Sequence, residues 1–210
     1  MFERFKAHYG PRMTSGATGN PWSAEPLLRV DGYATFMADF AGACFEGGLY
    51  RVHDAVTGPR GLAALREGFP EFAKRTVPFA YDWMGRQYAL DFGRSADGEP
   101  LILLFEPGSG EVLEVPVSLV TFHEHELVDY DDEVLGLAEF RSWAAAHPEH
   151  VPLPADVCVG YNLPLFLGGA PNADNLDVSD LDVYWTLCAQ LRQVSQDLPP
   201  GTSIGSVAIE

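Results

Sequence analysis

The strongest fold signal is the segment Val77-Pro78-Phe79-Ala80-Tyr81-Asp82-Trp83-Met84-Gly85-Arg86-Gln87-Tyr88-Ala89-Leu90-Asp91-Phe92. Its two arms, residues 77–82 and 87–92, alternate apolar and polar side chains and are rich in aromatic residues, which is typical of β-strands. Residues 83–86 lie between the arms and include a glycine. We therefore predict an antiparallel hairpin with its turn at 83–86.

A second hairpin follows in the chain. Residues 101–105 and 111–115 flank the turn sequence Pro107-Gly108-Ser109-Gly110. Residues 49–52 are predicted to form a short strand, and residues 117–122 are predicted to add a fifth strand or to lead into a helix. The predicted fold class is α+β: an antiparallel β-meander of about four to six strands flanked by helices.

Apolar residues at helical spacing predict helices on both sides of this meander. The first predicted helix carries Tyr33, Phe36, Met37, Phe40 and Cys44 and ends at Gly47-Gly48. The second opens at Gly58-Pro59 and carries Leu62 and Leu65. The third runs from Asp131 or Asp132 to about Ala146, and the fourth follows Ser179-Asp180-Leu181-Asp182. The last has the spacing of a capping box, and we expect Trp185 on its apolar face to be buried. Residues 152–175 are predicted to form a loop with a packed centre, and residues 198–210 a frayed end or an edge strand.

The net charge of −17 is distributed unevenly along the 210 residues. Residues 1–94 contain 11 basic and 10 acidic side chains, whereas residues 95–210 contain 2 basic and 20 acidic ones. Such a polyanionic half repels nucleic acids and anionic membranes and speeds encounter with a basic partner. Solubility alone is the simpler explanation of this charge.

The apolar content of 47% predicts a globular chain. The sequence has no apolar run long enough to span a membrane and no signal peptide, so we expect a cytoplasmic protein.

Candidate chemistry is sparse. His123 and His125 would share one face of a strand, where two imidazoles and a carboxylate could hold a transition metal, but further ligands are not evident. The sequence contains no phosphate-binding loop and no GxSxG elbow. The cysteines Cys44, Cys158 and Cys188 match neither a disulfide framework nor a metal knuckle, so we expect them to be reduced. No catalytic residue, metal or cofactor is therefore predicted.

Acidic residues concentrate in two segments, at 124–133 and 174–182. We expect them to form one negative patch that binds a basic partner, although helix capping also explains some of them, Asp132 and Asp180 above all. The candidate patch residues are Glu124, Glu126, Asp129, Asp131, Asp132, Glu133, Asp174, Asp177, Asp180 and Asp182.

An ordered set of motifs resembles a known family. The set consists of Phe5, Gly10 and the segments 47–52, 81–89, 104–111, 160–169 and 180–185. In these motifs the chain resembles bacterial immunity proteins of the type VI secretion DNase-effector class, which join a GAD-like N-terminal region to a C-terminal immunity domain of SUKH-like architecture. The resemblance implies a GAD-like region with the meander at 1–120 and a helical immunity region at 121–210, packed together as one compact unit.

The same resemblance implies a non-enzymatic inhibitor that neutralises a cognate toxin by occluding its active site. It carries over no catalytic residues. The charge asymmetry is compatible with a basic nuclease as the target. Two alternatives from other classes remain: a metal-dependent hydrolase that uses His123 and His125, and an adaptor that recruits a protein unrelated to any toxin.

Overall fold

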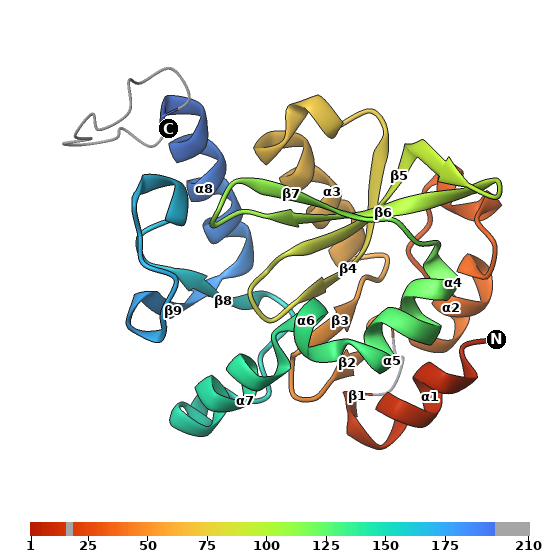
Figure 1. Cartoon of the computed structure of the whole chain (residues 1–210), viewed down its shortest axis with the longest axis horizontal. Coiled ribbons are helices and arrows are strands. Elements are labelled where there is room, and N and C mark those ends of the chain that lie inside the picture. Colours follow the sequence, from red (N-terminus) through yellow and green to blue (C-terminus); the bar gives the residue numbers. More distant parts are fainter. Residues whose placement is uncertain (16–18, 196–210) are drawn as a thin grey trace.

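The predicted hairpin at 77–92 forms the centre of a large antiparallel sheet (Figure 1). The computed structural model describes residues 1–15 and 19–195. Its strands are β1 (Met13–Ser15), β2 (Cys44–Phe45), β3 (Tyr50–Val52), β4 (Thr76–Asp82), β5 (Gln87–Ala96), β6 (Glu99–Glu106), β7 (Glu111–Val115), β8 (Val157–Tyr161) and β9 (Leu176–Asp180). Its helices are α1 (Glu3–Tyr9), α2 (Tyr33–Phe40), α3 (Thr57–Gly68), α4 (Leu119–Thr121), α5 (Leu127–Asp129), α6 (Asp131–Leu135), α7 (Leu137–Ala146) and α8 (Leu181–Ser195).

The predicted α+β class and the meander are confirmed. Strands β1 to β7 pair with their neighbours in sequence order, and every pairing is antiparallel. The four strands predicted at 77–115 are β4 to β7, and the short strand predicted at 49–52 is β3. Strands β1 and β2 extend the sheet to seven strands, and β8 and β9 form a separate two-stranded sheet.

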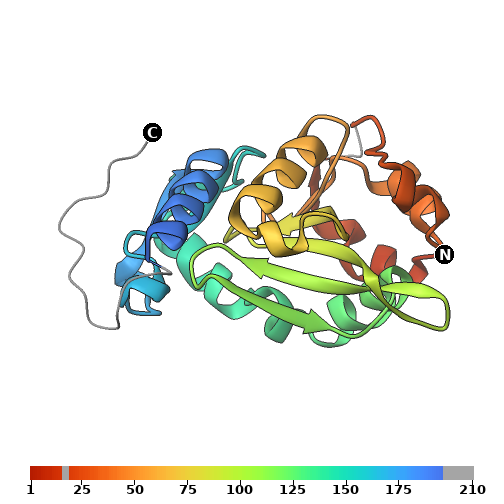
Figure 2. The ribbon, with the colours of Figure 1, turned by 90° about the horizontal axis from the view of Figure 1, so that it is seen from above.

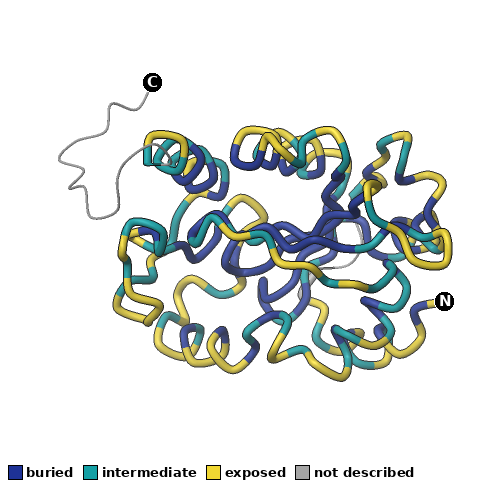
Figure 3. The backbone as a smooth tube through the Cα atoms, turned by 45° about the horizontal axis from the view of Figure 1, so that its top comes forward, coloured by how far each residue is buried: buried dark blue, intermediate teal, exposed yellow. Residues whose placement is uncertain are grey.

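Helices cover both faces of the sheet. Figure 2 shows α3 and α8 on one face and α4 to α7 on the other, and Figure 3 shows the buried strands between two layers whose outer sides are exposed. The alternation along β5 and β6 divides the core accordingly. Tyr88 and Leu104 belong to the larger hydrophobic cluster, whereas Ala89, Leu103 and Phe105 belong to a second cluster that includes residues of α3 and α8.

The turn of the central hairpin is organised by a buried carboxylate. Asp82 has no exposed surface, and its Oδ1 accepts hydrogen bonds from the main-chain N–H groups of Met84 (3.0 Å) and Arg86 (3.1 Å). Its Oδ2 accepts from Arg86 Nε (2.5 Å) and from the Tyr88 hydroxyl (3.2 Å). The turn therefore needs an acidic residue at 82 and a cation at 86.

Other elements attach to this turn by hydrogen bonds to the main chain. Arg86 Nη2 donates to the carbonyl oxygen of Val134 in α6 at 3.1 Å. The Tyr88 hydroxyl lies 3.0 Å from the same oxygen, so its one proton is shared between Val134 O and Asp82 Oδ2. The Trp83 indole donates to Leu135 O (2.9 Å), and the Trp185 indole of α8 donates to Gly85 O (2.8 Å). The turn thus connects the sheet to helices on both faces.

Several local predictions are corrected. The helix predicted to carry Tyr33 to Cys44 is α2, which ends at Phe40. Cys44 lies in β2 instead, because Gly42 takes a φ of +74° and turns the chain. The helix predicted from Asp131 to Ala146 is two helices, separated by Gly136 at a φ of +67°. The last helix begins at Leu181, and Asp180 caps it by accepting from Val183 N at 2.9 Å.

The segment predicted as a loop at 152–175 contains a strand. Strand β8 (Val157–Tyr161) pairs with β9 (Leu176–Asp180), which extends into the predicted capping box. The predicted packed centre, residues 160–169, is only partly buried: Leu163 is 47% exposed, and residues 165–167 have intermediate exposure. Gly169 is required there because a Cβ atom would lie 1.9 Å from Leu163 O. Both predictions for residues 198–210 fall outside the described part of the chain.

Residues 117–122 lead into helix rather than a strand, and this changes the environment of both candidate metal-ligating histidines. The π-helical turn η4 (Phe122–Glu126) buries His123 completely and leaves His125 exposed. The predicted shared strand face for His123 and His125 is therefore wrong. A helical backbone turns consecutive side chains by about 100°, so the two rings diverge.

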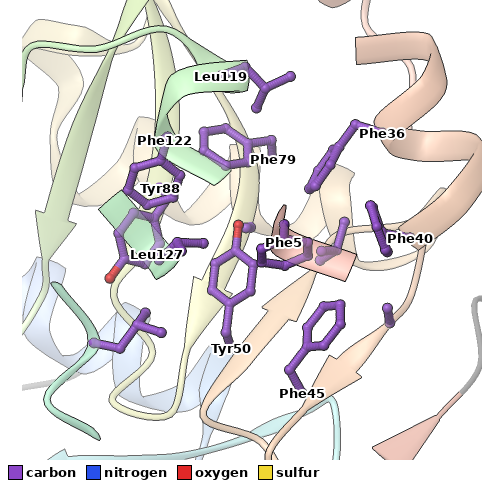
Figure 4. Close-up of a cluster of buried hydrophobic side chains, with 14 of the residues drawn as sticks. Phe5, Phe36, Phe40, Phe45, Tyr50, Phe79, Tyr88, Leu119, Phe122 and Leu127 are labelled. Carbon is purple, nitrogen blue, oxygen red and sulfur yellow. The ribbon is translucent and has the colours of Figure 1, made fainter. Parts of the chain in front are cut away.

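His123 is buried among aromatic rings of the core, of which Figure 4 shows Phe5, Phe36, Phe79 and Phe122. Its ring centroid lies 4.2 Å from that of Phe36 and 5.1 Å from that of Phe5. The Nδ1 lies 2.8 Å from Leu119 O, which can only accept, so the Nδ1 carries the proton and Nε2 accepts from the Tyr50 hydroxyl at 2.9 Å. His123 is therefore a neutral core residue with both ring nitrogens in hydrogen bonds.

Replacing Trp185 with alanine should lower the free energy of unfolding by about 3 to 5 kcal/mol, because the side chain is 2% exposed, packs against Phe69 and fills the space above Gly68. Urea denaturation followed by circular dichroism measures this change. Val183→Ala is the control, because Val183 lies on the same helix and is 52% exposed. Equal midpoints for the two variants would contradict the packing role of Trp185.

Acid should destabilise the fold through buried histidines. Burial lowers the pKa of His123 to about 3 and that of His53 to about 4, compared with about 6.5 in an unfolded chain. Because the folded pKa values are depressed, this contribution to stability is complete above about pH 6.5. It is lost as the pH falls toward the folded values, by up to about 1.4 kcal/mol per pH unit and ring.

Urea midpoints measured between about pH 6.5 and about pH 5 test this linkage. The His123→Gln variant should lose less stability over that interval than wild type, whereas His150→Gln, at an exposed ring, should follow wild type. A His123→Gln variant with the wild-type pH slope would show that His123 is not responsible.

Candidate functional site

A groove opens between α7 and residues 171–176, which precede and begin β9. We call it the α7 groove; its volume is about 280 Å³. Helix α7 supplies one wall, the 171–176 segment supplies the other, and Met84 and Tyr161 are contributed by the central turn and β8. The lining residues are Met84, Glu139, Ser142, Trp143, Ala146, His147, Tyr161, Pro171, Asn172, Ala173 and Leu176.

Aromatic stacking shapes the α7 wall. The Trp143 and His147 rings lie one helical turn apart and stack with centroids 5.0 Å apart and an interplanar angle of 21°. His147 Nδ1 lies 2.9 Å from the Trp143 carbonyl oxygen, so the imidazole also caps the helix end. This wall is therefore held in place before any ligand arrives.

Asn175 fixes the opposite wall. Its Nδ2 donates to Leu163 O (2.8 Å) and to Ala170 O (3.0 Å), and its Oδ1 accepts from Leu163 N (2.9 Å). The Asn175 carbonyl accepts from Asn162 N at 2.8 Å. These bonds hold the glycine-rich 160–170 segment against the start of β9 and set the position of the wall.

The indole of Trp143 differs from those of the other tryptophans. Trp22, Trp83 and Trp185 each donate their Nε1 proton to a main-chain carbonyl, at 3.0, 2.9 and 2.8 Å. Within residues 1–15 and 19–195, the Trp143 Nε1 has no hydrogen-bond acceptor. Trp143 is 6% exposed and lines the α7 groove.

The charge around the α7 groove is one-sided. Residues 142–191 contain six acidic side chains and no lysine or arginine. Arg141, on α7, pairs with Glu46 at 3.0 Å, and Glu139 lines the groove itself. Glu139 and Asp174, the acidic residues at or next to the groove, form no ion pair within the described residues, so an approaching partner meets negative potential there.

The structure pairs several of the predicted acidic patch residues with cations. Asp129 forms a bidentate ion pair with Arg4 of α1, at 2.6 and 3.0 Å, and this guanidinium lowers the pKa of Asp129. Glu124 accepts from the Arg4 main-chain N–H at 3.4 Å. Asp131 lies 3.0 Å from His8 Nε2, and Asp182 pairs with Arg60 of α3.

Other predicted patch residues satisfy main-chain groups. Asp132 accepts from Ala138 N (2.7 Å) in the first turn of α7, and Asp180 caps α8. The Asp177 carboxylate accepts from the next residue, Val178, at 2.8 Å. The capping explanation is thus correct for Asp132 and Asp180.

The remaining candidates, Glu126, Glu133 and Asp174, form neither an ion pair nor a side-chain hydrogen bond within the described ranges. Figure 1 shows α5 and β9, which carry or adjoin the two acidic segments, well apart along the long axis of the molecule. Asp174 belongs to the turn between Ala173 and Asn175 and lies next to the α7 groove.

A second hollow, of about 260 Å³, lies beside β3 and residues 152–155. Arg51 lines it but is 2% exposed; its guanidinium donates to Pro154 O and Val157 O, each at 2.7 Å, and lies over the Tyr81 ring at 4.4 Å. Arg51 thus attaches the 154–157 segment to the sheet, a structural role that the sequence analysis missed.

The two buried thiols are poorly suited to act as nucleophiles. Burial raises the pKa of the Cys158 and Cys188 thiols to about 12, which disfavours thiolates, and neither thiol is in a disulfide. No group of three or more His, Cys, Asp or Glu residues that could hold a metal occurs within the described residues. In the same residues, no helix is long and apolar enough to cross a membrane.

Comparison with known proteins gives a match to a family model and matches to solved structures. Residues 141–192 match the family model described as "T6SS immunity protein Tdi1, C-terminal". No curated protein sequence matches the chain. Among solved structures, the crystal structure of Atu4351 from Agrobacterium tumefaciens matches with a TM-score of 0.56 and 13% identity, covering 90% of this chain and 89% of that one. The chain therefore shares its fold with Atu4351, and its residues 141–192 are similar to the C-terminal part of a type VI secretion system (T6SS) immunity protein.

Proposed function

We propose that this chain is an immunity protein that binds a toxin delivered by a type VI secretion system and neutralises it. The observation that carries the proposal is the match of residues 141–192 to the immunity family. These residues include the end of α7, both strands of the small sheet and most of α8. They supply every lining residue of the α7 groove except Met84 and Glu139.

The proposed mechanism is occlusion of the toxin by a binding surface rather than chemical modification. The part of the chain similar to the immunity family carries a largely apolar groove and acidic side chains, which suit the binding of a protein partner. Its negative charge suits a basic toxin, such as a nuclease whose active site attracts phosphates. In this proposal residues 121–210 supply the binding region, residues 1–120 support it, and the chain acts in the cytoplasm.

Co-expression tests the proposal directly. The effector encoded beside this gene should inhibit growth when produced alone, and this chain should restore growth and co-purify with the effector in a stoichiometric complex. A catalytically inactivated effector serves for the binding measurement. Failure to protect the cells and to bind the effector would reject the immunity function.

Neutralising acidic residues without a cation partner should slow association with the effector. Glu133→Gln, Asp174→Asn and Asp177→Asn together should lower the association rate by about tenfold at low salt and flatten its dependence on ionic strength, because long-range attraction accelerates encounter. Stopped-flow fluorescence at low and high salt measures both quantities. A rate that is insensitive to the substitutions and to salt would rule out electrostatic steering.

The control for this experiment neutralises three carboxylates that already have partners or cap a helix. Asp129→Asn, Asp131→Asn and Asp132→Asn remove the same formal charge, but Asp129 and Asp131 already face Arg4 and His8. We expect a smaller change in the association rate than for the first set.

A further inference from the structure

We infer that the α7 groove is the anchoring pocket of the toxin interface, and that it receives one aromatic side chain from a basic segment of the toxin. The inference rests on the proposed function and adds the surface and the chemistry of its partner. It draws on three observations: the apolar lining, the indole N–H of Trp143, and the charge of the surrounding chain.

The lining favours a flat apolar side chain. Met84 and Trp143 are 9% and 6% exposed, so they form a floor, while Ala146 and Ala173 keep the two walls short. Tyr161 and Leu176 complete the apolar surface. Concave, largely apolar pockets of this kind receive the aromatic residues that dominate interface energies.

The Trp143 indole supplies a polar contact. Its N–H is the one tryptophan donor, of the four, without an acceptor in the described structure. A peptide segment that enters the α7 groove brings main-chain carbonyl oxygens, which are acceptors of the kind that the other three indoles use. A hydrocarbon ligand would leave this donor unused.

Charge selects the residues beside the aromatic anchor. Nine of the eleven lining residues belong to residues 142–191, which contain no lysine or arginine, and Glu139 and Asp174 lie at or beside the groove. A segment with lysine or arginine next to its aromatic residue therefore gains attraction at the rim. A second copy of this chain would bring a net charge of −17 to the same surface, so we exclude it as the expected occupant.

Filling the groove tests the inference. Ala146→Trp places a bulky ring in the groove, whereas Ala145→Trp places the same ring at the neighbouring exposed position of α7 that does not line it. We expect Ala146→Trp to weaken binding to the inactivated effector by about tenfold or more, equivalent to about 1.4 kcal/mol, and Ala145→Trp to leave the affinity within about twofold of wild type. Isothermal titration calorimetry measures both, and equal urea midpoints show that both variants are folded.

A second variant acts from the opposite wall. Ala173→Trp should weaken binding to the inactivated effector as much as Ala146→Trp does. It also provides the test if the Ala146→Trp variant does not fold. Trp143→Phe retains an apolar ring but removes the N–H, so we expect an affinity several-fold below that of wild type.

The outcomes separate this inference from the proposed function. Wild-type affinity in both Ala146→Trp and Ala173→Trp would overturn the groove as the anchor while leaving the immunity function intact. Absence of binding by the wild-type chain would overturn both. A wild-type dimer in solution that Ala146→Trp converts to a monomer would assign the groove to a second copy, and would overturn the inference that the toxin occupies it.

Discussion

The buried carboxylate of Asp82 is the interaction on which the other elements depend. It holds the turn of the central hairpin through the main-chain N–H groups of Met84 and Arg86. The side chains of Arg86 and Tyr88 also hydrogen-bond to it. Removing one partner of a buried ion pair typically costs about 3 to 5 kcal/mol, because the other charge is left in an apolar environment. Arg86 and Tyr88 also share the Val134 carbonyl, so loss of the carboxylate would disturb the α6 contact as well as the turn.

This turn also explains how the part of the chain similar to the immunity family is joined to the sheet. Val159 of β8 donates to Trp83 O at 2.8 Å, and Trp185 of α8 donates to Gly85 O. Residues 141–192 therefore build their groove against a turn contributed by a distant part of the sequence, with Met84 as part of the floor. The C-terminal segment gains its shape from the meander rather than from its own core alone.

The fold was largely predictable because the signals were local. Alternation at 77–115 and the glycine-containing turns identified four strands, and the apolar stripe of the last helix correctly predicted that Trp185 is buried.

Strand β8 was not predicted, because the proline and glycine residues around it are typical of a loop. His123 was misplaced because a π-helical turn and a strand contain the same residue types, and only the packing of Phe36 and Tyr50 around the ring separates the two. The α7 groove has walls about 30 residues apart in sequence, so no local pattern contained it.

The hydrogen bonds of Asn175 have a consequence for the lifetime of a complex. They fix the 171–176 wall at the Leu163 and Ala170 carbonyls, so the groove has its shape before a ligand enters. A preorganised pocket loses little conformational entropy on binding, and the saving appears mainly as slower dissociation. If the groove holds the toxin as proposed, this wall predicts a complex that outlasts many encounters between the toxin and its substrate.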